Sequence, residues 1–354
     1  MAGEPRILAI NPGSTSTKLG VFAGNVAETV AEIAHDPEHL ALYRKISAQE
    51  GYRYGLVEEF LERAGGGLDA AVGRGGILRP LPGGVYKIDA VMLRDLREAR
   101  FGSHASNLGA PIAHRVAARR GIPAFIADPP VVDELDDVSR VTGHPLVKRR
   151  SIFHALNQKE AARRYAAQTG GKYERLVLVV CHLGGGISVG VHRNGRVAWV
   201  NSALDGEGPF APERSGGLPA AGVLELALSG KYSADDLRRM IAGAGGLMAH
   251  LGTSDLRRVL ALKTRRSGLV IEALALSVAR EISAAVGFIG GLPDAVIITG
   301  NMALSEEFTR MVTGRIDKVF NVVVMPGSFE LEALAAAAVR VLSGEEEARD
   351  YIAL

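Results

Sequence analysis

The sequence predicts an α/β protein made of two similar domains, and three observations carry this prediction. Short apolar runs end at glycine or at a small polar turn, as buried strands do. These runs are residues 7–10, 176–182 and 295–299. Residues 8–21 and 179–191 look alike, each an apolar strand, a glycine-containing turn and a second strand, which indicates an internal duplication. Helical segments follow each copy, and that alternation favours α/β layers over a β-sandwich.

The expected helical segments are 109–120 in the first half and 269–289 in the second. In the second segment, apolar residues recur at roughly the spacing of an amphipathic helix. They are Leu269, Leu276, Ile282, Val286 and Ile289. A further strand is expected at 321–325, followed by a Pro-Gly turn and an alanine-rich helix at 329–342.

The composition indicates a globular protein that binds small molecules. The 354 residues, 47% of them apolar, suffice for two domains that each bury a core, which excludes a disordered or fibrous chain. Lys and Arg number 41 against 39 Asp and Glu, so no basic excess indicates nucleic acid. The single cysteine, Cys181, cannot form an internal disulfide, and residues 1–6 contain no apolar signal segment. We therefore expect a cytoplasmic protein that does not enter a membrane.

The turn at residues 11–18 has the composition of a phosphate-binding loop. It combines a glycine, four hydroxyl side chains and a lysine between two expected strands. Glycine allows close backbone approach, amides and hydroxyls donate to phosphate oxygens, and the lysine supplies positive charge. The ligand-binding residues would be Asn11, Ser14, Ser16 and Lys18. The alternative is an ordinary polar hairpin, because the loop is not a Walker A sequence.

Two later turns are also candidates for ligand binding. The second turn consists of His182, Leu183, Gly184, Gly185 and Gly186. Its bare backbone would let a ligand lie against the chain, with His182 donating to a phosphoryl group, although a histidine at a strand end is often structural. Gly300 and Asn301 end the third apolar run just before a helix, where a ligand would bind or an ordinary turn would lie.

In this order and at these separations, the three turns resemble the two phosphate loops and the adenosine loop of the acetate and sugar kinase, Hsp70 and actin superfamily. The butyrate kinases of the acetokinase family resemble this chain most specifically, at 182–219 (HLGGGISVGVHRNGRVAWVNSALDGEGPFAPERSGGLP) and at 125–135 (FIADPPVVDEL). The resemblance extends over residues 7–342. Acetate kinases are less similar, because their second loop usually has asparagine where this chain has Gly185, and their chains are usually longer.

This resemblance implies a ribonuclease H-like fold of two duplicated domains, each a mixed sheet with flanking helices, with the active site in the cleft between them. The expected first domain, residues 1–150, carries the first phosphate loop and an arginine for the acyl substrate. The second, residues 151–328, carries the second phosphate loop and the adenosine loop. Residues 329–354 are expected to form a helix that returns to the first domain.

The resemblance also assigns charged residues to the site. Arg74 and Arg214 match the arginines that acetate kinases use at the acyl phosphate, and the glycines beside each would leave room for the ligand. Asp128 matches the acid that sugar kinases use as a general base. A carboxylate acceptor is already ionised at neutral pH, however, so we expect Asp128 to orient Mg²⁺ through water.

Other positions follow from the same resemblance. Glu330 would lie near the metal with Asn11, although Glu332 is an alternative, and an acid in the first turn of a helix is favourable without any ligand. His104 and His154 match histidines that line the catalytic cleft of acetate kinases.

The acyl and nucleotide contacts complete the implied site. Phe153 would help to form the acyl pocket. Asp255 and Arg257 match the family's contact with adenosine or its phosphates, whereas a helix cap at Asp255 would explain part of that motif without a ligand.

The implied reaction converts ATP and butanoate to ADP and butanoyl phosphate, reversibly and by direct in-line attack, with Mg²⁺ bound. Arg74, Arg214 and His182 would stabilise the charge. Kinases for acetate, propionate or branched-chain acids are alternatives, as is a nucleotide-gated binding protein without catalytic activity. Family likeness favours a homo-oligomer, whereas the number of subunits, the physiological direction and the preferred acyl length stay open.

Overall fold

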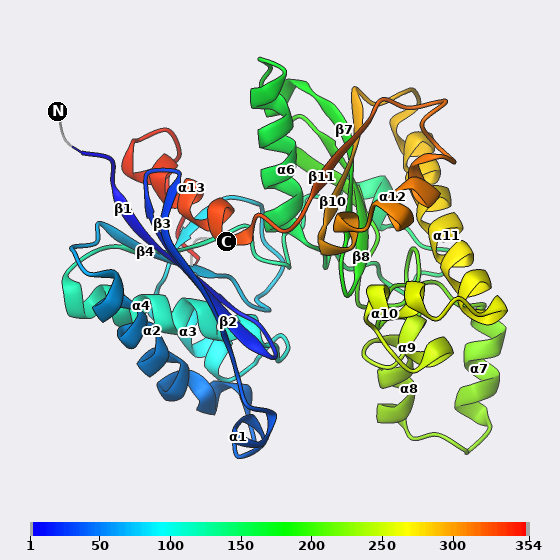
Figure 1. Ribbon diagram of the computed structural model, residues 1–354, viewed down its shortest axis with the longest axis horizontal. Helices are drawn as coiled ribbons and strands as arrows, with labels where there is room; N and C mark the ends of the chain where they lie inside the picture. Colours follow the sequence, from blue (N-terminus) through cyan, green and yellow to red (C-terminus); the bar gives the residue numbers. More distant parts are fainter. Residues whose placement is uncertain (1–2, 352–354) are drawn as a thin grey trace. The chain divides into compact units, whose positions relative to one another are not determined.

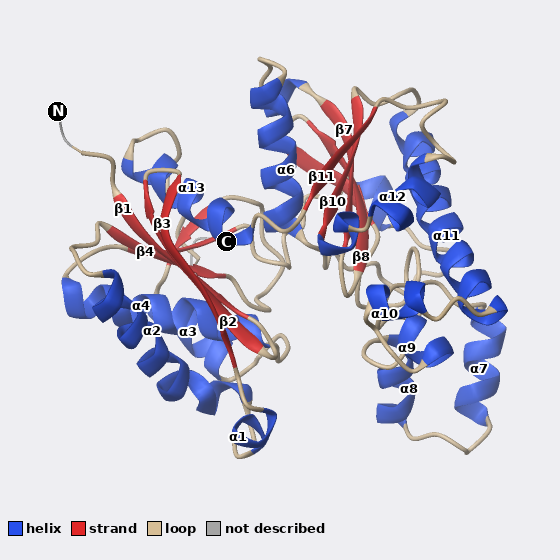
Figure 2. Cartoon of the chain, viewed as in Figure 1, coloured by secondary structure: helices blue, strands red, loops and turns tan. Residues whose placement is uncertain are grey.

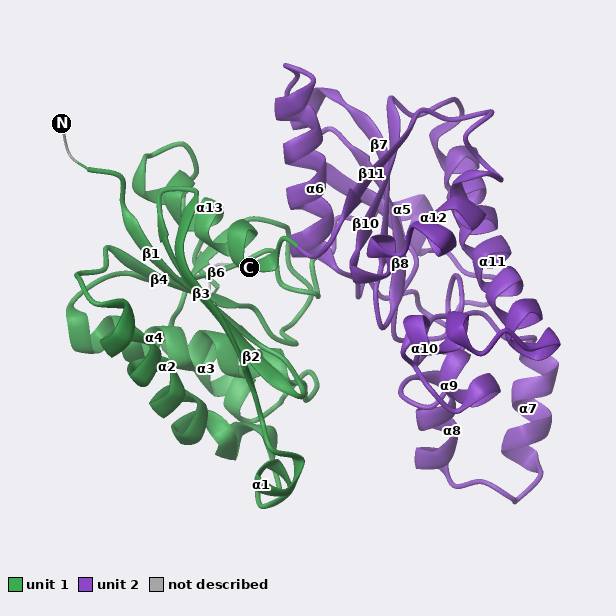
Figure 3. Cartoon of the chain, in the orientation of Figure 1, with its two compact units in different colours: residues 1–132, 329–354 green, residues 133–328 purple. Residues whose placement is uncertain are grey.

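The computed structural model describes residues 3–351. The chain forms two compact units, Met1–Val132 together with Phe329–Leu354, and Asp133–Ser328 (Figure 3). Each unit contains one mixed β-sheet with helices packed on both faces (Figure 2). The α/β prediction is therefore confirmed. Within residues 3–351, no helix is long and apolar enough to span a bilayer.

The sheet of the first unit has six strands in the order β3-β2-β1-β4-β6-β5. They are β1 (Arg6–Pro12), β2 (Ser16–Ala23), β3 (Val26–Ala34), β4 (Ala70–Arg74), β5 (Val85–Lys87) and β6 (Ala124–Ala127). β1 runs antiparallel to β2 and parallel to β4, which runs parallel to β6. The carboxyl ends of β1, β4 and β6 therefore meet at one edge of the sheet, where residues distant in sequence come together.

Helices cover both faces of this sheet (Figure 1). The helices of the first unit, with short 3₁₀ segments marked η, are α1 (Pro37–Ala41), η1 (Ile46–Gln49), α2 (Glu50–Ala64), α3 (Ala90–Arg97), η2 (Ala105–Leu108), α4 (Gly109–Arg120) and α13 (Glu330–Leu342). α2 and α4 share an apolar core with Leu8 and Ile10 of β1, whereas α13 packs on the opposite face. Since successive strand residues point to opposite faces, Asn11 faces α13.

The sheet of the second unit has five strands in the order β11-β10-β7-β8-β9. They are β7 (Val177–Leu183), β8 (Ile187–Arg193), β9 (Arg196–Val200), β10 (Ala295–Gly300) and β11 (Val322–Pro326). The antiparallel pair β7 and β8, with β10 parallel to β7, repeats the arrangement of β1, β2 and β4. The three strands expected from the apolar runs are β1, β7 and β10, and the two similar segments form matching hairpins.

The helices of the second unit are α5 (Asp137–Arg140), α6 (Ala155–Gln168), η3 (Tyr173–Arg175), α7 (Ala220–Leu228), α8 (Ala234–Ile241), α9 (Gly246–Leu251), α10 (Leu256–Ala261), α11 (Arg265–Ile289), η4 (Asn301–Leu304) and α12 (Glu306–Thr313). α11 and α12 bury Val179 and Cys181 of β7 in one apolar core. α6 packs against β7 and β10 on the other face, so His182 faces α6.

The helix expected at 269–289 is present, but the apolar stripe expected on it is wrong in part. Leu269 and Leu276 are 68% and 56% exposed. The buried side of α11 instead contains Ile271, Leu274 and Val278, which repeat at the same helical spacing. Because apolar residues occur around much of this helix, periodicity alone does not select the buried face.

The expected domain boundary near residue 150 is also corrected, because residues 133–150 belong to the second unit. Nζ of Lys159 on α6 lies 2.9 Å from a carboxylate oxygen of Glu134, and both side chains are buried. Arg193 of β8 holds Asp136 at 2.6 Å. These partners come from later elements, so no local pattern marks the boundary.

Candidate active site

Polar side chains gather at the strand ends of the first unit. Asn11 lies in β1 and Arg74 ends β4, and the preceding residues of the two parallel strands pair directly. Arg74 pairs in turn with Ala127 of β6, the residue before Asp128. The fold therefore brings Asn11, Arg74 and Asp128 to one edge of the sheet.

Glu330, at the start of α13, contacts two of these residues. Nη1 of Arg74 lies 3.1 Å from Oε1 of Glu330 and donates a 3.2 Å hydrogen bond to Oδ1 of Asn11. Nδ2 of Asn11 donates to Oε2 of Glu330 at 2.6 Å. Glu330, and not the alternative Glu332, makes these contacts. Because the Arg74 and Glu330 side chains are 19% and 15% exposed, they are partly shielded from water but still within reach of a ligand.

Asp128 follows β6 in a strained backbone conformation. Its φ of 37° lies in the left-handed region, which residues other than glycine rarely adopt. Its amide donates to the carbonyl of Gly84 at 3.0 Å, and its Oδ1 accepts from the amide of Gly84 at 2.8 Å. Such strain persists only where the surroundings impose it and is concentrated at functional sites.

The oxygens of this cluster fit Mg²⁺. Mg²⁺ prefers oxygen ligands, keeps several waters and uses one or two carboxylates together with substrate phosphates. Asp128 and Glu330 offer carboxylates, and Asn11 offers an amide oxygen. Across residues 3–351, no group of three or more acidic, histidine or cysteine side chains is placed to hold a metal by itself. The residues therefore suit a Mg²⁺ ion that arrives with a nucleotide.

The first loop is a tight turn in which the amide of Gly13 donates to the carbonyl of Ser16 at 2.8 Å. Ser14 is exposed at its tip. Oγ of Ser16 donates to Glu32 of β3 at 2.8 Å, and Nζ of Lys18 lies 3.8 Å from the same carboxylate. Sequence reasoning missed Glu32 because it belongs to a third strand. An exposed ion pair of this kind contributes about 0–1 kcal/mol, so a phosphate competes with it readily.

In the second unit, two of the histidines that were predicted to belong to the active site lie face to face. The rings of His154 and His182 stack with centroids 3.9 Å apart and 14° between their planes. Nδ1 of His182 lies 2.7 Å from Oδ1 of Asn157, and Nδ1 of His154 lies 2.9 Å from Oγ of Ser188. An amide oxygen only accepts, so Nδ1 of His182 carries the proton in this arrangement. Its Nε2 is the nitrogen directed at the glycine loop.

Sequence reasoning missed a polar layer behind these histidines. Its members are fully buried, namely Asn157, Gln158, Ser188 and Thr299. Thr299 donates to Oδ1 of Asn157 at 3.3 Å, and Gln158 donates to Oγ of Ser188 at 2.8 Å. Nδ2 of Asn157 is buried and has no hydrogen-bond partner in the described part of the chain. Two adjacent amide side chains in an alanine-rich helix were the available signal, and the unmet donor indicates that this layer serves more than packing.

Only one residue of the triple glycine leaves open space. A Cβ at Gly184 would lie 2.8 Å from Nε2 of His182, and one at Gly186 would overlap the guanidinium of Arg214. Gly185 is exposed, and a Cβ there would meet nothing closer than 3.9 Å. The space expected for a ligand along this loop is therefore confined to Gly185. At Gly184 and Gly186, the space that a side chain would need is occupied by His182 and Arg214.

Arg214 lies close to the glycine loop, and Glu213 is the acidic residue whose charge acts on its guanidinium. Its Nη1 donates to the carbonyl of Ala203 at 2.8 Å. Burial lowers the pKa of its guanidinium, and Glu213 partly offsets this effect. Arginine nevertheless stays protonated in proteins, so the site keeps a cation that an anionic ligand would stabilise.

Most of the glycines beside the two arginines do not make room for a ligand, so that expectation is wrong in part; at Gly217 alone among them, an added Cβ would meet nothing closer than 3.8 Å. A Cβ at Gly75 would lie 2.5 Å from Cβ of Pro129, and one at Gly76 would lie 2.5 Å from Oδ1 of Asn107. Gly216 has a φ of 61° and would overlap the backbone at Phe210. Close crossings of the chain itself exclude side chains at Gly75, Gly76 and Gly216.

Several other residues that were predicted to contact the nucleotide have structural roles that require no ligand. Oδ1 of Asp255 caps α10 by accepting from the amide of Arg257 at 2.9 Å, and the Arg257 side chain is 91% exposed. Gly300 has a φ of 96° and packs against the carbonyl of Leu183. Asn301 is exposed at the start of η4. Their nucleotide contacts stay predictions.

The two remaining acyl-site residues differ in exposure. His104 is exposed and caps η2, its Nδ1 accepting from the amide of Ser106 at 3.1 Å. Phe153 is 2% exposed and lies beside His154 in the sequence. Capping of η2 accounts for His104, and a buried position accounts for Phe153, without any ligand. The contacts of both residues with substrate stay predictions.

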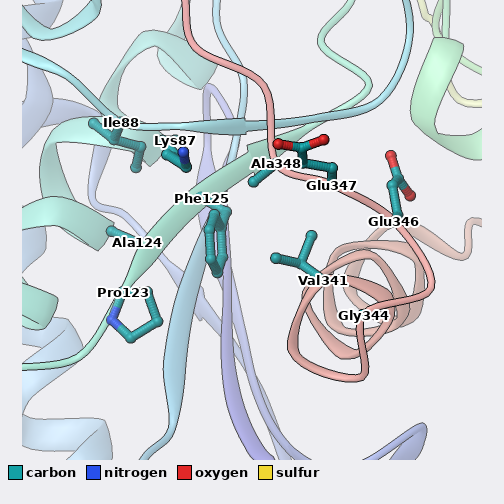
Figure 4. Close-up of a pocket in the computed structure, with 10 residues that line it drawn as sticks. All are labelled: Lys87, Ile88, Pro123, Ala124, Phe125, Val341, Gly344, Glu346, Glu347 and Ala348. Atoms are coloured by element: carbon teal, nitrogen blue, oxygen red, sulfur yellow. The ribbon is translucent and has the colours of Figure 1, made fainter.

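A pocket of about 660 Å³ in the first unit lies away from these residues (Figure 4). Its lining residues are Lys87, Ile88, Pro123, Ala124, Phe125, Val341, Gly344, Glu346, Glu347 and Ala348. It opens at the start of β6, whereas Asp128 follows the end of that strand. Ligands of α/β proteins bind beyond the carboxyl ends of strands, so this pocket is not the candidate active site.

The two related sheets define the chain as a protein of the actin-like fold that acetate and sugar kinases share. An acetate kinase from Porphyromonas gingivalis superposes with a TM-score of 0.73 at 16% identity, over 96% of this chain and 100% of that one. A propionate kinase from Francisella tularensis subsp. tularensis gives 0.73 at 16% identity, over 94% and 98%. A ROK family protein from Streptococcus pneumoniae in complex with sucrose gives 0.51 at 12% identity, over 96% and 99%. At these identities the likeness establishes the fold.

Residues 137–324 match the model of the acetokinase family, which is more than half of the chain. The protein therefore belongs to the acetokinase family. Membership implies ATP-dependent kinase activity toward a carboxylate, normally with Mg²⁺.

Proposed function

We propose that the protein transfers the γ-phosphoryl group of ATP to butanoate, giving ADP and butanoyl phosphate in a reversible reaction. The observation that carries the carboxylate kinase assignment is the contact of Arg74 with Asn11 and Glu330 at the strand ends of the first unit. This contact places a cation that can bind an anionic substrate beside oxygen atoms that can bind Mg²⁺. The choice of butanoate is supported by the resemblance of residues 182–219 and 125–135 to the butyrate kinases.

The chemistry requires cancellation of negative charge. A carboxylate oxygen attacks the γ-phosphorus in line, and the bond from that phosphorus to the oxygen of ADP breaks, without a covalent enzyme intermediate. The acceptor is already ionised, so Asp128 has no proton to remove. Arg74 and Arg214 offset the repulsion between the two anions, and Nε2 of His182 donates to the phosphoryl oxygens when the ring is protonated. Mg²⁺, held by Asn11, Asp128 and Glu330 with the nucleotide, supplies further positive charge when bound.

The remaining residues bind and orient the substrates in this proposal. Those at the ATP phosphates are Asn11, Ser14, Ser16, Lys18, Gly184, Gly185 and Gly186. Those at the adenosine side are Asp255, Arg257, Gly300 and Asn301. Those near the acyl group are His104 and Phe153, with Arg74 and Arg214, whereas His154 acts with the catalytic residues.

The experiment is trapping of acyl phosphate as hydroxamate from ATP, Mg²⁺ and one acid at a time. Acetate, propionate, butanoate and isobutanoate are compared at equal concentrations. The largest kcat/KM for the four-carbon acids is the expected result. A maximum with acetate or propionate would make the protein a sibling kinase with the same mechanism. No product with any acid would refute the proposal and favour a nucleotide-gated binding protein.

We also propose a cytoplasmic homo-oligomer. α7 has the apolar sequence AAGVLELAL, yet none of its residues is buried. Leu224 and Leu228 on this helix are 58% and 76% exposed. Contiguous exposed apolar side chains are typical of protein–protein interfaces, which supports contact with a second copy of the chain.

A further inference from the structure

A buried arginine lies beneath the first phosphate loop. Arg53 of α2 is 0% exposed. Its guanidinium donates to Oε1 of Gln49 at 2.9 and 3.1 Å, to Oγ1 of Thr17 at 3.1 Å, and to the carbonyls of Gly13 at 2.8 Å and Ser16 at 3.4 Å. All of these acceptors are neutral, and no acidic side chain within residues 3–351 forms an ion pair with Arg53.

This arrangement leaves a buried positive charge without a counter-ion. Removing a cation from water costs several kcal/mol, and oxygen dipoles return only part of that cost. The desolvation is visible in the pKa of Arg53, which burial lowers from its usual value. Arginine still keeps its proton at neutral pH, so the charge persists under the loop. An anion bound on the other side of the loop would supply the missing compensation.

The contact between Arg53 and the loop also sets the direction of a backbone donor. A trans peptide group is planar, with its C=O and N–H pointing in opposite directions. The carbonyl of Gly13 accepts from Arg53, so the N–H of Ser14, in the same peptide group, points away from the guanidinium. Ser14 is exposed, and in the described chain the amides of Ser14 and Thr15 donate to no protein group. A hydrogen bond to the carbonyl polarises the N–H of the same peptide and makes it a better donor.

We propose that Arg53 is a positioning residue for nucleotide phosphates at the first loop, and that the bound phosphate is the counter-ion that the buried guanidinium lacks. Arg53 acts through the Gly13–Ser14 peptide group and through its field, without touching the ligand. The inference rests on the proposed function, because it assigns the ATP or ADP phosphates to this loop. It adds a residue outside the resemblance, found one turn before Val57 on the buried side of α2.

Replacing Gln49 by glutamate provides the sharpest test. Gln49→Glu retains the size of the side chain and places a carboxylate where Oε1 now accepts from Arg53. The internal ion pair neutralises the guanidinium without removing it. We expect a higher Tm for the ligand-free variant together with a Kd for Mg-ADP raised about tenfold by isothermal titration calorimetry. A structural role alone would change Tm and leave the Kd unaltered. Gln168→Glu, at an exposed position of α6, is the matched control.

Arg53→Met is a second variant, which keeps much of the volume and removes the charge. We expect its Kd for Mg-ADP to rise at least tenfold, whereas Arg63→Met, at an exposed site on the same helix, stays within twofold of the wild-type chain. A Kd within twofold of wild type for Gln49→Glu would overturn the inference, whatever happens to Tm. Because binding is measured without turnover, this result is separate from the fate of the proposed function. A wild-type chain that does not bind Mg-ADP would overturn both.

Discussion

Replacing Gly186 by alanine tests the role of Arg214 without altering the arginine itself. The added methyl group would overlap Nη1 and Cζ of Arg214 and would lie 2.8 Å from Nε, whereas ordinary contacts begin at 3.4 Å. Gly186 is not among the residues with positive φ, so alanine adds no backbone strain there. The guanidinium must therefore shift and lose its 2.8 Å hydrogen bond to the carbonyl of Ala203.

The size of the effect follows from this displacement. Relief of the overlap requires at least 0.6 Å at Nε, the difference between 3.4 and 2.8 Å, and a larger movement at the tip. A misplacement of about 1 Å at a catalytic group costs on the order of 100-fold in rate. Loss of one donor to a developing anion costs about 2.7–4 kcal/mol. We therefore expect kcat to fall about 100-fold, while the KM for ATP changes little.

The assay is hydroxamate trapping, carried out on a double-mutant cycle of Gly186→Ala and Arg214→Ala. If the methyl group acts through Arg214, it adds almost no further loss once the arginine is gone. Gly185→Ala is the comparison, because its methyl group meets nothing closer than 3.9 Å and leaves Arg214 in place. That variant reports on the approach of the nucleotide to the loop, through the KM for ATP. A full 100-fold loss from Gly186→Ala in the Arg214→Ala background would refute the reasoning.

Four further predictions follow from the same contacts. Glu330→Gln removes the charge beside Arg74, and we expect the Mg²⁺ concentration for half-maximal activity to rise severalfold with little change in the KM for butanoate; an unchanged Mg²⁺ requirement would exclude a metal role. Asn157→Leu leaves the His182 Nδ1–H without its acceptor and should cost about 1–3 kcal/mol in urea unfolding, with a lower kcat; equal stability to wild type would contradict this. Burial, with Arg53 and His39 nearby, lowers the pKa of His35 to about 4. The unfolded chain therefore binds more protons than the folded chain between pH 6.5 and 4, and the free energy of unfolding falls as the pH is lowered through that window. His35→Gln should reduce this pH dependence in urea unfolding. Leu224→Glu on α7 should reduce the mass measured by light scattering, and an unchanged mass would place the interface elsewhere.

Local patterns in the sequence were sufficient for much of the fold. Apolar runs that end at glycine located β1, β7 and β10, because burial and turn chemistry are decided by neighbouring residues. The segment 109–120 coincides with α4, and the similarity of 8–21 to 179–191 anticipated the matching hairpins. Side-chain chemistry also indicated two candidate phosphate loops, because hydroxyls, backbone amides and cations all bind anions. Phosphate binding at these loops stays a prediction.

The tertiary structure decided which of these residues contact one another. Glu32, Asn157 and Arg53 escaped notice because their contacts join distant strands and helices. The packing of Arg214 against Gly186 was not foreseen for the same reason, because Arg214 comes from a later loop. Sequence determines local conformation through nearest neighbours and periodicity. Strand register and packing depend on the whole unit, so contacts between distant side chains become known only from the folded chain.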